Sequence, residues 1–73
     1  MARKHPDWLD RQTKVSWSGE SRWTNKKKDQ IYTYDSLHGE VEVFNKRGRH
    51  LGALDPDTGV FIKDPVPGRS IDV

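Results

Sequence analysis

The sequence contains no cysteine in its 73 residues, and hydrophobic residues make up only 32% of it. The missing thiols exclude both a disulfide framework and a zinc site with thiolate ligands. No apolar run approaches the ~20 residues of a membrane-spanning helix, and no apolar signal-peptide segment follows Met1. We therefore expect one small soluble domain that works in a reducing compartment, away from membranes. Its thin core should consist largely of the three Trp, two Tyr and two Phe side chains.

Positive charge is concentrated in the first part of the chain. Residues 1–30 contain eight Lys or Arg and four Asp or Glu, whereas residues 31–73 contain five and seven, and the net charge is +2. A basic surface attracts the phosphates of a nucleic acid. Carboxylates beside such a surface repel that ligand, so their presence favours a protein that performs chemistry on nucleic acid over one that only binds it.

Short β-rich segments separated by Gly, Pro, Asn and Asp turns dominate the chain. They predict a mainly β (α+β) fold with a small antiparallel sheet. Ahead of the strands, we predict a short helix over 6–14, with Pro6 in its first turn, and a loop rich in Ser over 15–21. The predicted strands are residues 22–24, 31–34, 40–44, 50–54 and 60–63, and residues 69–73 can close an edge of the sheet.

One face of the central predicted strand gathers groups that can act on a phosphodiester. Alternate side chains of a strand share a face, so His38, Glu40 and Glu42 lie together while the intervening valines face the core. Asp35 lies just before the turn and joins this polar group. Cleavage of RNA without a metal needs a base for the 2′-hydroxyl, an acid for the leaving 5′-oxygen and a cation for the phosphorane. Clustered carboxylates and an imidazole supply the base and the acid, and Arg69 supplies the cation if the end of the chain returns beside this strand.

Each of these signals also has a simpler structural explanation. Alternating Glu and Val is typical of a strand with one solvated face, and the lysine run at 26–28 is typical of a solvated turn. A metal site on the imidazole and the two glutamates is unfavourable, because ligands on one strand spread by about 6.6–6.8 Å per two residues. We therefore expect no metal and no cofactor. His5 and His50 fit solvated residues, and we assign them no role.

The order and spacing of several motifs resemble the ribonuclease domain of the ribosome-inactivating E-group colicins. The pattern Tyr-x-x-Asp-Ser-x-His-Gly-Glu-x-Glu is specific, and later Gly and Pro turns add to it. The resemblance covers residues 22–71, about two thirds of the chain. We accordingly divide the chain into an N-terminal extension, 1–21, and a colicin-type ribonuclease domain, 22–73. The motifs are Arg22-Trp23-Thr24, Ile31-Tyr32-Thr33-Tyr34-Asp35-Ser36-Leu37-His38-Gly39-Glu40-Val41-Glu42, His50-Leu51-Gly52, Asp55-Pro56-Asp57-Thr58-Gly59 and Asp64-Pro65-Val66-Pro67-Gly68-Arg69.

The resemblance implies a strongly twisted antiparallel sheet with a helical N-terminal piece. It implies a cytotoxic endoribonuclease that cuts small-subunit (16S) ribosomal RNA once, at the decoding site, without a metal and with a 2′,3′-cyclic phosphate as product. The family's catalytic residues fall on Asp35, His38, Glu42 and Arg69, and Glu40 matches a further acidic position near the site. The basic residues that we expect to contact RNA are Lys26, Lys27, Lys28 and Arg22.

The spacing of His38 and Glu42 raises a geometric difficulty. Four residues span ~13 Å along a straight strand, so both groups can flank one phosphate only if Gly39 bends the chain or the strand twists strongly. We assign Glu42 as the general base, His38 as the general acid and Asp35 as the group that orients or charges His38. The reverse assignment of His38 and Glu42 remains open.

The resemblance also implies partners and a setting. The partners are the ribosome and a tight-binding acidic immunity protein or antitoxin, and the chain is expected to act as a monomer in the cytoplasm of the target or producing bacterial cell. Colicins carry translocation and receptor-binding domains that this chain does not contain, so it is either part of a larger secreted toxin or a free-standing toxin. Three departures from the family pattern weaken the expected grip on ribosomal RNA: Phe44 replaces an aromatic hydroxyl, Asp57 replaces a usual Lys, and the tail is Ile71-Asp72-Val73.

Two other functions stay open on the sequence. The chain can be a non-catalytic RNA-binding β-module whose acids are merely solvated, or a protein-interaction module whose acids and Trp residues dock a partner. A nuclease that cuts another RNA, such as transfer RNA, is a variant of the ribonuclease interpretation. Only a nuclease accounts for carboxylates and an imidazole clustered beside a basic half.

Overall fold

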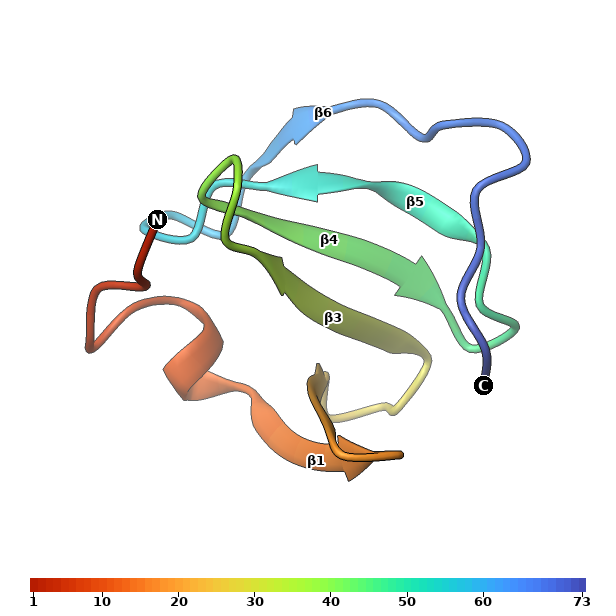
Figure 1. The fold of residues 1–73 in the computed structure, drawn as a ribbon, viewed down its shortest axis with the longest axis horizontal. Coiled ribbons are helices and arrows are strands. Elements are labelled where there is room, and N and C mark those ends of the chain that lie inside the picture. The colour runs from red at the N-terminus through yellow and green to blue at the C-terminus, as the bar shows by residue number, and fades with distance from the viewer.

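Six strands form one antiparallel sheet in the computed structural model, which describes residues 1–73 (Figure 1). Neighbouring strands in the sheet are also neighbours in the chain, and every pair is antiparallel. The predicted mainly β fold is therefore confirmed. The elements are a 3-10 turn, η1 (Leu9–Arg11), and the strands β1 (Thr13–Trp17), β2 (Glu20–Thr24), β3 (Gln30–Asp35), β4 (Glu40–Asn45), β5 (His50–Leu54) and β6 (Phe61–Lys63).

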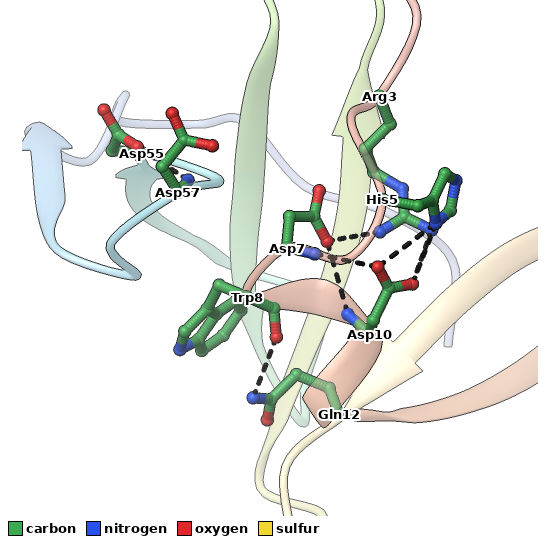
Figure 2. Close-up of polar contacts among 8 residues, drawn as sticks. All are labelled: Arg3, His5, Asp7, Trp8, Asp10, Gln12, Asp55 and Asp57. Carbon is green, nitrogen blue, oxygen red and sulfur yellow. Dashed lines mark hydrogen bonds and ion pairs between the residues drawn. The ribbon is translucent and has the colours of Figure 1, made fainter.

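The predicted helix over 6–14 is wrong, because only the three residues of η1 are helical. Figure 2 shows two reciprocal hydrogen bonds that enclose this turn. The Asp7 N–H donates to the Asp10 carboxylate at 2.8 Å, and the Asp10 N–H donates to the Asp7 carboxylate at 3.3 Å. From Thr13 onward the backbone pairs with β2 instead of continuing the helix, as its β-branched residues favour.

The predicted loop over 15–21 is also wrong, since most of it belongs to the β1–β2 hairpin. Trp17 pairs with Glu20, which leaves Ser18 and Gly19 as a two-residue turn. Both have positive φ, 48° and 79°, the combination that a tight hairpin turn requires and that Gly adopts without strain. The boundary predicted after residue 21 consequently falls inside β2.

The C-terminal segment does not form the predicted edge strand at 69–73. It makes one isolated antiparallel bridge, between Ser70 and Arg49, and it crosses the end of the sheet near the β4–β5 turn. A longer ladder does not form because the segment crosses the strand ends instead of running alongside one strand. From this crossing the side chain of Arg69 reaches Glu42 on β4.

The core lies between η1 and one face of the sheet. Trp8, Tyr34 and Leu51 pack against it half-buried. The expectation that all aromatic side chains form the core is wrong for Trp17 and Phe61, which are 40% and 52% exposed because they lie on the edge strands β1 and β6. The core cluster consists of Leu9, Trp23, Tyr32, Val41, Val43 and Leu54.

No helix of this chain has the length and apolar character needed to cross a membrane.

On β4, Val41 and Val43 are completely buried in the core, as the alternation predicts. The other face of β4 is where the predicted catalytic side chains lie.

Candidate functional site

The β3–β4 turn holds Asp35 and His38 against each other. One oxygen of Asp35 accepts the backbone N–H of Leu37 at 3.0 Å and of His38 at 3.3 Å. The other accepts a hydrogen bond from Nδ1 of His38 at 2.7 Å. An aspartate at the start of a turn commonly binds the amides that follow it, so the local sequence itself builds this pair. The bond from the His38 imidazole, with the help of the turn amides, holds the pKa of Asp35 below its ordinary value.

Gly39 resolves the spacing difficulty between His38 and Glu42. Its φ is +66°, and its N–H donates to the carbonyl of Asp35 at 2.8 Å. This left-handed conformation, which suits glycine, closes the turn and returns the chain into β4. His38 and Glu42 consequently line one hollow of about 220 Å³ despite their separation in sequence.

Glu42 is the most enclosed acid of the hollow, and its side chain is only 7% exposed. One carboxylate oxygen lies 2.9 Å from Nη1 of Arg69, and the other lies 3.1 Å from Nε2 of His50. Arg69 comes from the C-terminal crossing and His50 from β5, so three separate segments meet here. A buried carboxylate is stable when it is paired and hydrogen-bonded in this way.

The protonation of His50 follows from its two partners. Its Nδ1 lies 3.0 Å from the backbone nitrogen of Val66, which can only donate, so Nδ1 must accept and carry no proton. The proton of the neutral ring is then on Nε2, which donates it to Glu42. Phe44 packs edge-on against the imidazole with ring centres 5.3 Å apart. The imidazole of His50 is therefore held by a hydrogen bond at each ring nitrogen and by packing against the ring of Phe44.

Glu40 lies at the margin of the same hollow and pairs with a residue of β6. Nζ of Lys63 is 2.9 Å from its carboxylate, and Lys63 remains 55% exposed. This carboxylate raises the pKa of Lys63 above its ordinary value. Three of the four acids that line the hollow have a cation or an imidazole as partner, whereas the fourth, Asp64, is exposed and makes no ion pair. Asp35 has His38, Glu40 has Lys63, and Glu42 has Arg69 and His50.

This arrangement has the parts of a phosphodiester-cleaving site. A carboxylate and an imidazole face one hollow, and two cations, Arg69 and Lys63, lie on its wall. A phosphate that entered would find opposite charge and a fork of N–H donors. Asp35, Glu40 and Glu42 are each paired with a cation or an imidazole, so a metal ion could bind these three acids only by displacing that partner.

The structure brings together all five residues predicted for the reaction centre: Asp35, His38, Glu40, Glu42 and Arg69. It places the predicted RNA contacts elsewhere. The exposed lysines at 26–28 form the β2–β3 turn. Arg22 is buried, at 5% exposure; its guanidinium donates to the carbonyl of Asp72 at 2.6 Å and stacks on Trp17. This buried arginine binds the C-terminal segment, and its guanidinium is not accessible to RNA. The position of Arg22 therefore does not support the predicted RNA contact.

Sequence reasoning missed three ionisable residues of the hollow, His50, Lys63 and Asp64. His50 is 7% exposed, so its interpretation as a solvated residue is wrong. Simple alternation backwards from Leu54 would place residue 50 on the core face, and only the register shift between β4 and β5, at Val43 and Phe44, turns His50 to the face of Glu42. Lys63 had no local signal, since its partner Glu40 lies 23 positions earlier in the chain.

Comparison with known proteins finds similar proteins in Escherichia coli. The chain is 50% identical to cloacin of Escherichia coli over 52 residues, which is 70% of this chain and 9% of cloacin. It is 49% identical to colicin E3 over 51 residues and 44% identical to colicin E6 over 52 residues, both from Escherichia coli. These matches cover 68% and 70% of this chain and 9% of each relative.

The chain thus spans about a tenth of the length of these relatives. The family model described as Cytotoxic matches residues 4–72, which includes η1 and β1 as well as the five-residue site. On this match over almost its whole length, the chain belongs to the Cytotoxic family.

Proposed function

We propose that this chain is a cytotoxic endoribonuclease that cuts small-subunit (16S) ribosomal RNA at the decoding site and so blocks translation. The observation that carries the proposal is the buried carboxylate of Glu42, held by Arg69 and His50, in the same hollow as the Asp35–His38 pair. Membership of the Cytotoxic family and the likeness to colicin E3 and cloacin support it.

In this proposal the reaction is a transesterification within the RNA. Glu42 takes the proton of the 2′-hydroxyl, whose oxygen attacks the adjacent phosphorus. The bond from phosphorus to the 5′-oxygen breaks, and His38 gives that oxygen its proton. Asp35, bonded to Nδ1 of His38 at 2.7 Å, orients the imidazole and leaves Nε2 to face the substrate. The products are a 2′,3′-cyclic phosphate and a 5′-hydroxyl.

Arg69 has two successive partners in this scheme. Without RNA its Nη1 holds one oxygen of Glu42 at 2.9 Å. An incoming phosphate competes for the guanidinium, which at 46% side-chain exposure can turn toward it. Release of that Glu42 oxygen then exposes the lone pair that accepts the proton, while the donor from His50 keeps the carboxylate oriented. Substrate binding would thereby activate the base.

The reaction needs no metal in this proposal. Base, acid and phosphate-binding cation all come from side chains that already line the hollow, and Lys63 adds a second positive charge. Glu40 supports the site by holding Lys63 in place. The exposed lysines at 26–28 contribute phosphate contacts, whereas Arg22 is a structural residue.

The proposal includes the ribosome as target and an acidic immunity protein or antitoxin as inhibitor, with the chain acting as a monomer in the cytoplasm of a bacterial cell. Delivery as part of a larger secreted toxin agrees with the small share of the relatives that this chain spans. Residues 22–73 would carry the nuclease activity, with residues 1–21 supporting the fold through β1 and η1.

The experiment that tests the proposal is a cleavage assay on purified bacterial ribosomes in EDTA, followed by mapping of the RNA ends. Wild type should make one cut near the 3′ end of the small-subunit RNA. His38→Ala and Glu42→Gln should each lower the cleavage rate by about 10²–10⁴, the range for loss of a general acid or base. Asp57→Asn serves as the control, since it removes one exposed carboxylate on the β5–β6 turn, outside the residues that line the hollow.

The outcome contradicts the proposal if ribosomal RNA stays intact with wild type, or if the two active-site variants cut as fast as Asp57→Asn. Cleavage of transfer RNA in place of ribosomal RNA would keep the chemistry and change the substrate. Binding of RNA without any cleavage would favour a non-catalytic RNA-binding module.

A further inference from the structure

Two turns of the sheet lie side by side at the end opposite the catalytic turn. The β2–β3 turn covers 25–29 and the β4–β5 turn covers 46–49, and Gln30 pairs with Asn45 between them. Figure 1 shows both at the same end of β3 and β4, with the β3–β4 turn at the other end. Residues of the two turns also share the lining of one surface hollow. Segments some 20 positions apart in the chain thus form one continuous surface.

This surface carries six cations, which we call the two-turn basic patch. All six are exposed, and none of them takes part in any ion pair of the structure. The one acid among them, Asp29, is bonded to the side-chain amide of Asn25 at 2.6 Å. Repulsion among unpaired cations is unfavourable unless an anion is bound. The patch consists of Lys26, Lys27, Lys28, Lys46, Arg47 and Arg49.

An asparagine side chain fixes the backbone of each turn. The carbonyl of the Asn25 side chain accepts the N–H groups of Asp29 and Gln30, both at 3.1 Å. That of Asn45 accepts the N–H groups of Arg47 at 2.9 Å and Arg49 at 3.0 Å. The cations therefore project from ordered turns, which lowers the entropy lost when they bind a ligand.

The patch is continuous with the catalytic site. Arg49 and Arg69 line the same surface hollow of about 430 Å³, in which His50 also takes part. The backbone joins them as well, since the His50 N–H donates to the Arg69 carbonyl at 3.0 Å and Arg49 bridges to Ser70. Along β4, Asn45 is three residues or ~10 Å from Glu42. A path of positive charge consequently runs from the reacting phosphate to the end of the sheet.

We propose that the two-turn basic patch is a second RNA-binding site, which holds phosphates of the RNA strand several nucleotides away from the bond that is cut. This inference rests on the proposed nuclease function and extends it to the substrate grip. An acidic protein is the competing ligand. It is disfavoured because protein interfaces centre on buried apolar or aromatic anchors. The only exposed large apolar side chains beside the patch are two valines, Val66 and Val73, and neither is aromatic.

The test compares two double variants that lose the same charge. Lys46→Gln with Arg47→Gln removes two of the three cations of the β4–β5 turn. Lys4→Gln with Arg11→Gln removes two exposed, unpaired cations from the N-terminal segment. The binding probe is a single-stranded 2′-O-methyl RNA, which has no free 2′-hydroxyl and so resists the proposed cleavage. Its affinity is measured as a function of salt concentration, and cleavage of ribosomes is measured in parallel.

The patch variant should lower the slope of log affinity against log salt by about 1.4, since each single-strand phosphate contact contributes about 0.7. With equal affinity at 1 M salt, this slope corresponds to roughly 25-fold weaker binding at 0.1 M. The ribosome KM should rise while kcat at saturation stays unchanged. The control variant should shift neither the slope nor KM by a comparable amount.

Equal slopes for the two double variants would overturn the proposal, as would a patch variant that keeps its RNA affinity but loses binding to poly-L-glutamate, the probe for an acidic partner. The two proposals fail separately. A wild type that binds RNA through the patch but cuts nothing refutes the nuclease and supports the patch. A wild type that cuts, with a patch variant of equal kcat/KM, refutes the patch alone.

Discussion

Exchange of His50 for residues that reproduce only one of its two nitrogens should separate its two contacts. Asn places an oxygen where Nδ1 is and can still accept the Val66 N–H, but it has no group that reaches Glu42. Gln can place an N–H near the position of Nε2 and donate to Glu42, but it leaves the Val66 N–H unpaired. Ala removes both contacts together with the edge packing on Phe44. The three variants therefore dissect one buried side chain.

The expected losses of stability follow from what each variant leaves behind. His50→Asn removes a hydrogen bond to a charged acceptor, about 1.5–3 kcal/mol, and His50→Gln removes a neutral one, about 0.5–1.5 kcal/mol. His50→Ala loses both and adds a cavity beside Phe44, so about 3–5 kcal/mol is expected. A domain of this size has roughly 4–11 kcal/mol in total. The Ala variant should therefore be close to unfolding, while Gln and Asn stay folded.

Activity, measured where each variant is fully folded, tests separately whether the donor to Glu42 matters for catalysis. Urea unfolding gives the stability of each variant, and cleavage of ribosomes well below the unfolding midpoint gives its activity. We expect His50→Gln to keep most of the wild-type rate and His50→Asn to lose at least tenfold, because its Glu42 oxygen has no fixed donor. If Asn and Gln retain equal rates, or if Gln is the slower of the two, the positioning of Glu42 by His50 is refuted.

Three further perturbations test separate parts of the structure. Arg69→Lys keeps the charge but removes the bidentate fork, so kcat should fall about 10²-fold in the ribosome assay with little change in urea stability, because the side chain is half-exposed; an unchanged kcat would contradict the phosphate role. The folded chain lowers the pKa of Asp35 below its ordinary 3.8, so its ionised form stabilises the fold above that pH and this contribution is lost as the pH falls through the lower folded value. The stability difference between wild type and Asp35→Asn should accordingly be constant above about pH 5 and shrink below about pH 4, and a difference that grows on acidification would refute this sign. Gly59→Ala should destabilise by more than Gly19→Ala, since both have positive φ and cost about 1–2 kcal/mol, but only at Gly59 would the new Cβ meet the Trp8 ring, at 2.3 Å; equal losses in urea unfolding would show that the ring yields freely.

Local sequence was sufficient for the features that neighbouring residues create themselves. The alternation of Glu40 to Val43 predicts which side chains of β4 enter the core, because the two-residue period of a strand holds wherever it pairs. The Asp35–His38 contact is likewise local, since an aspartate binds the amides that follow it. Gly39 was one of the two sources of a bend that the sequence offered, and its positive φ of 66° places the tight turn there.

Errors arose where short-range signals compete. Residues 6–14 have the composition of a helix start, but pairing of β1 with β2 offers more backbone hydrogen bonds than a short isolated helix does. The turn at Ser18 and Gly19 is a strong hairpin signal that the surrounding serines obscured. The interpretation of 15–21 as a loop followed from composition alone.

The sequence by itself determined the β-rich class, the turn that joins Asp35 and His38, and the face of β4 that carries the acids, because each depends on residues within one strand or one turn. Only the tertiary structure decided that a buried His50 would bond to Glu42 and that Arg22 would bond to the C-terminal segment. It also decided that the two basic turns would lie side by side. These contacts join segments from 8 to 50 positions apart. Strand register and the path of the C-terminal crossing set them, and neither is encoded in the pattern of any single segment.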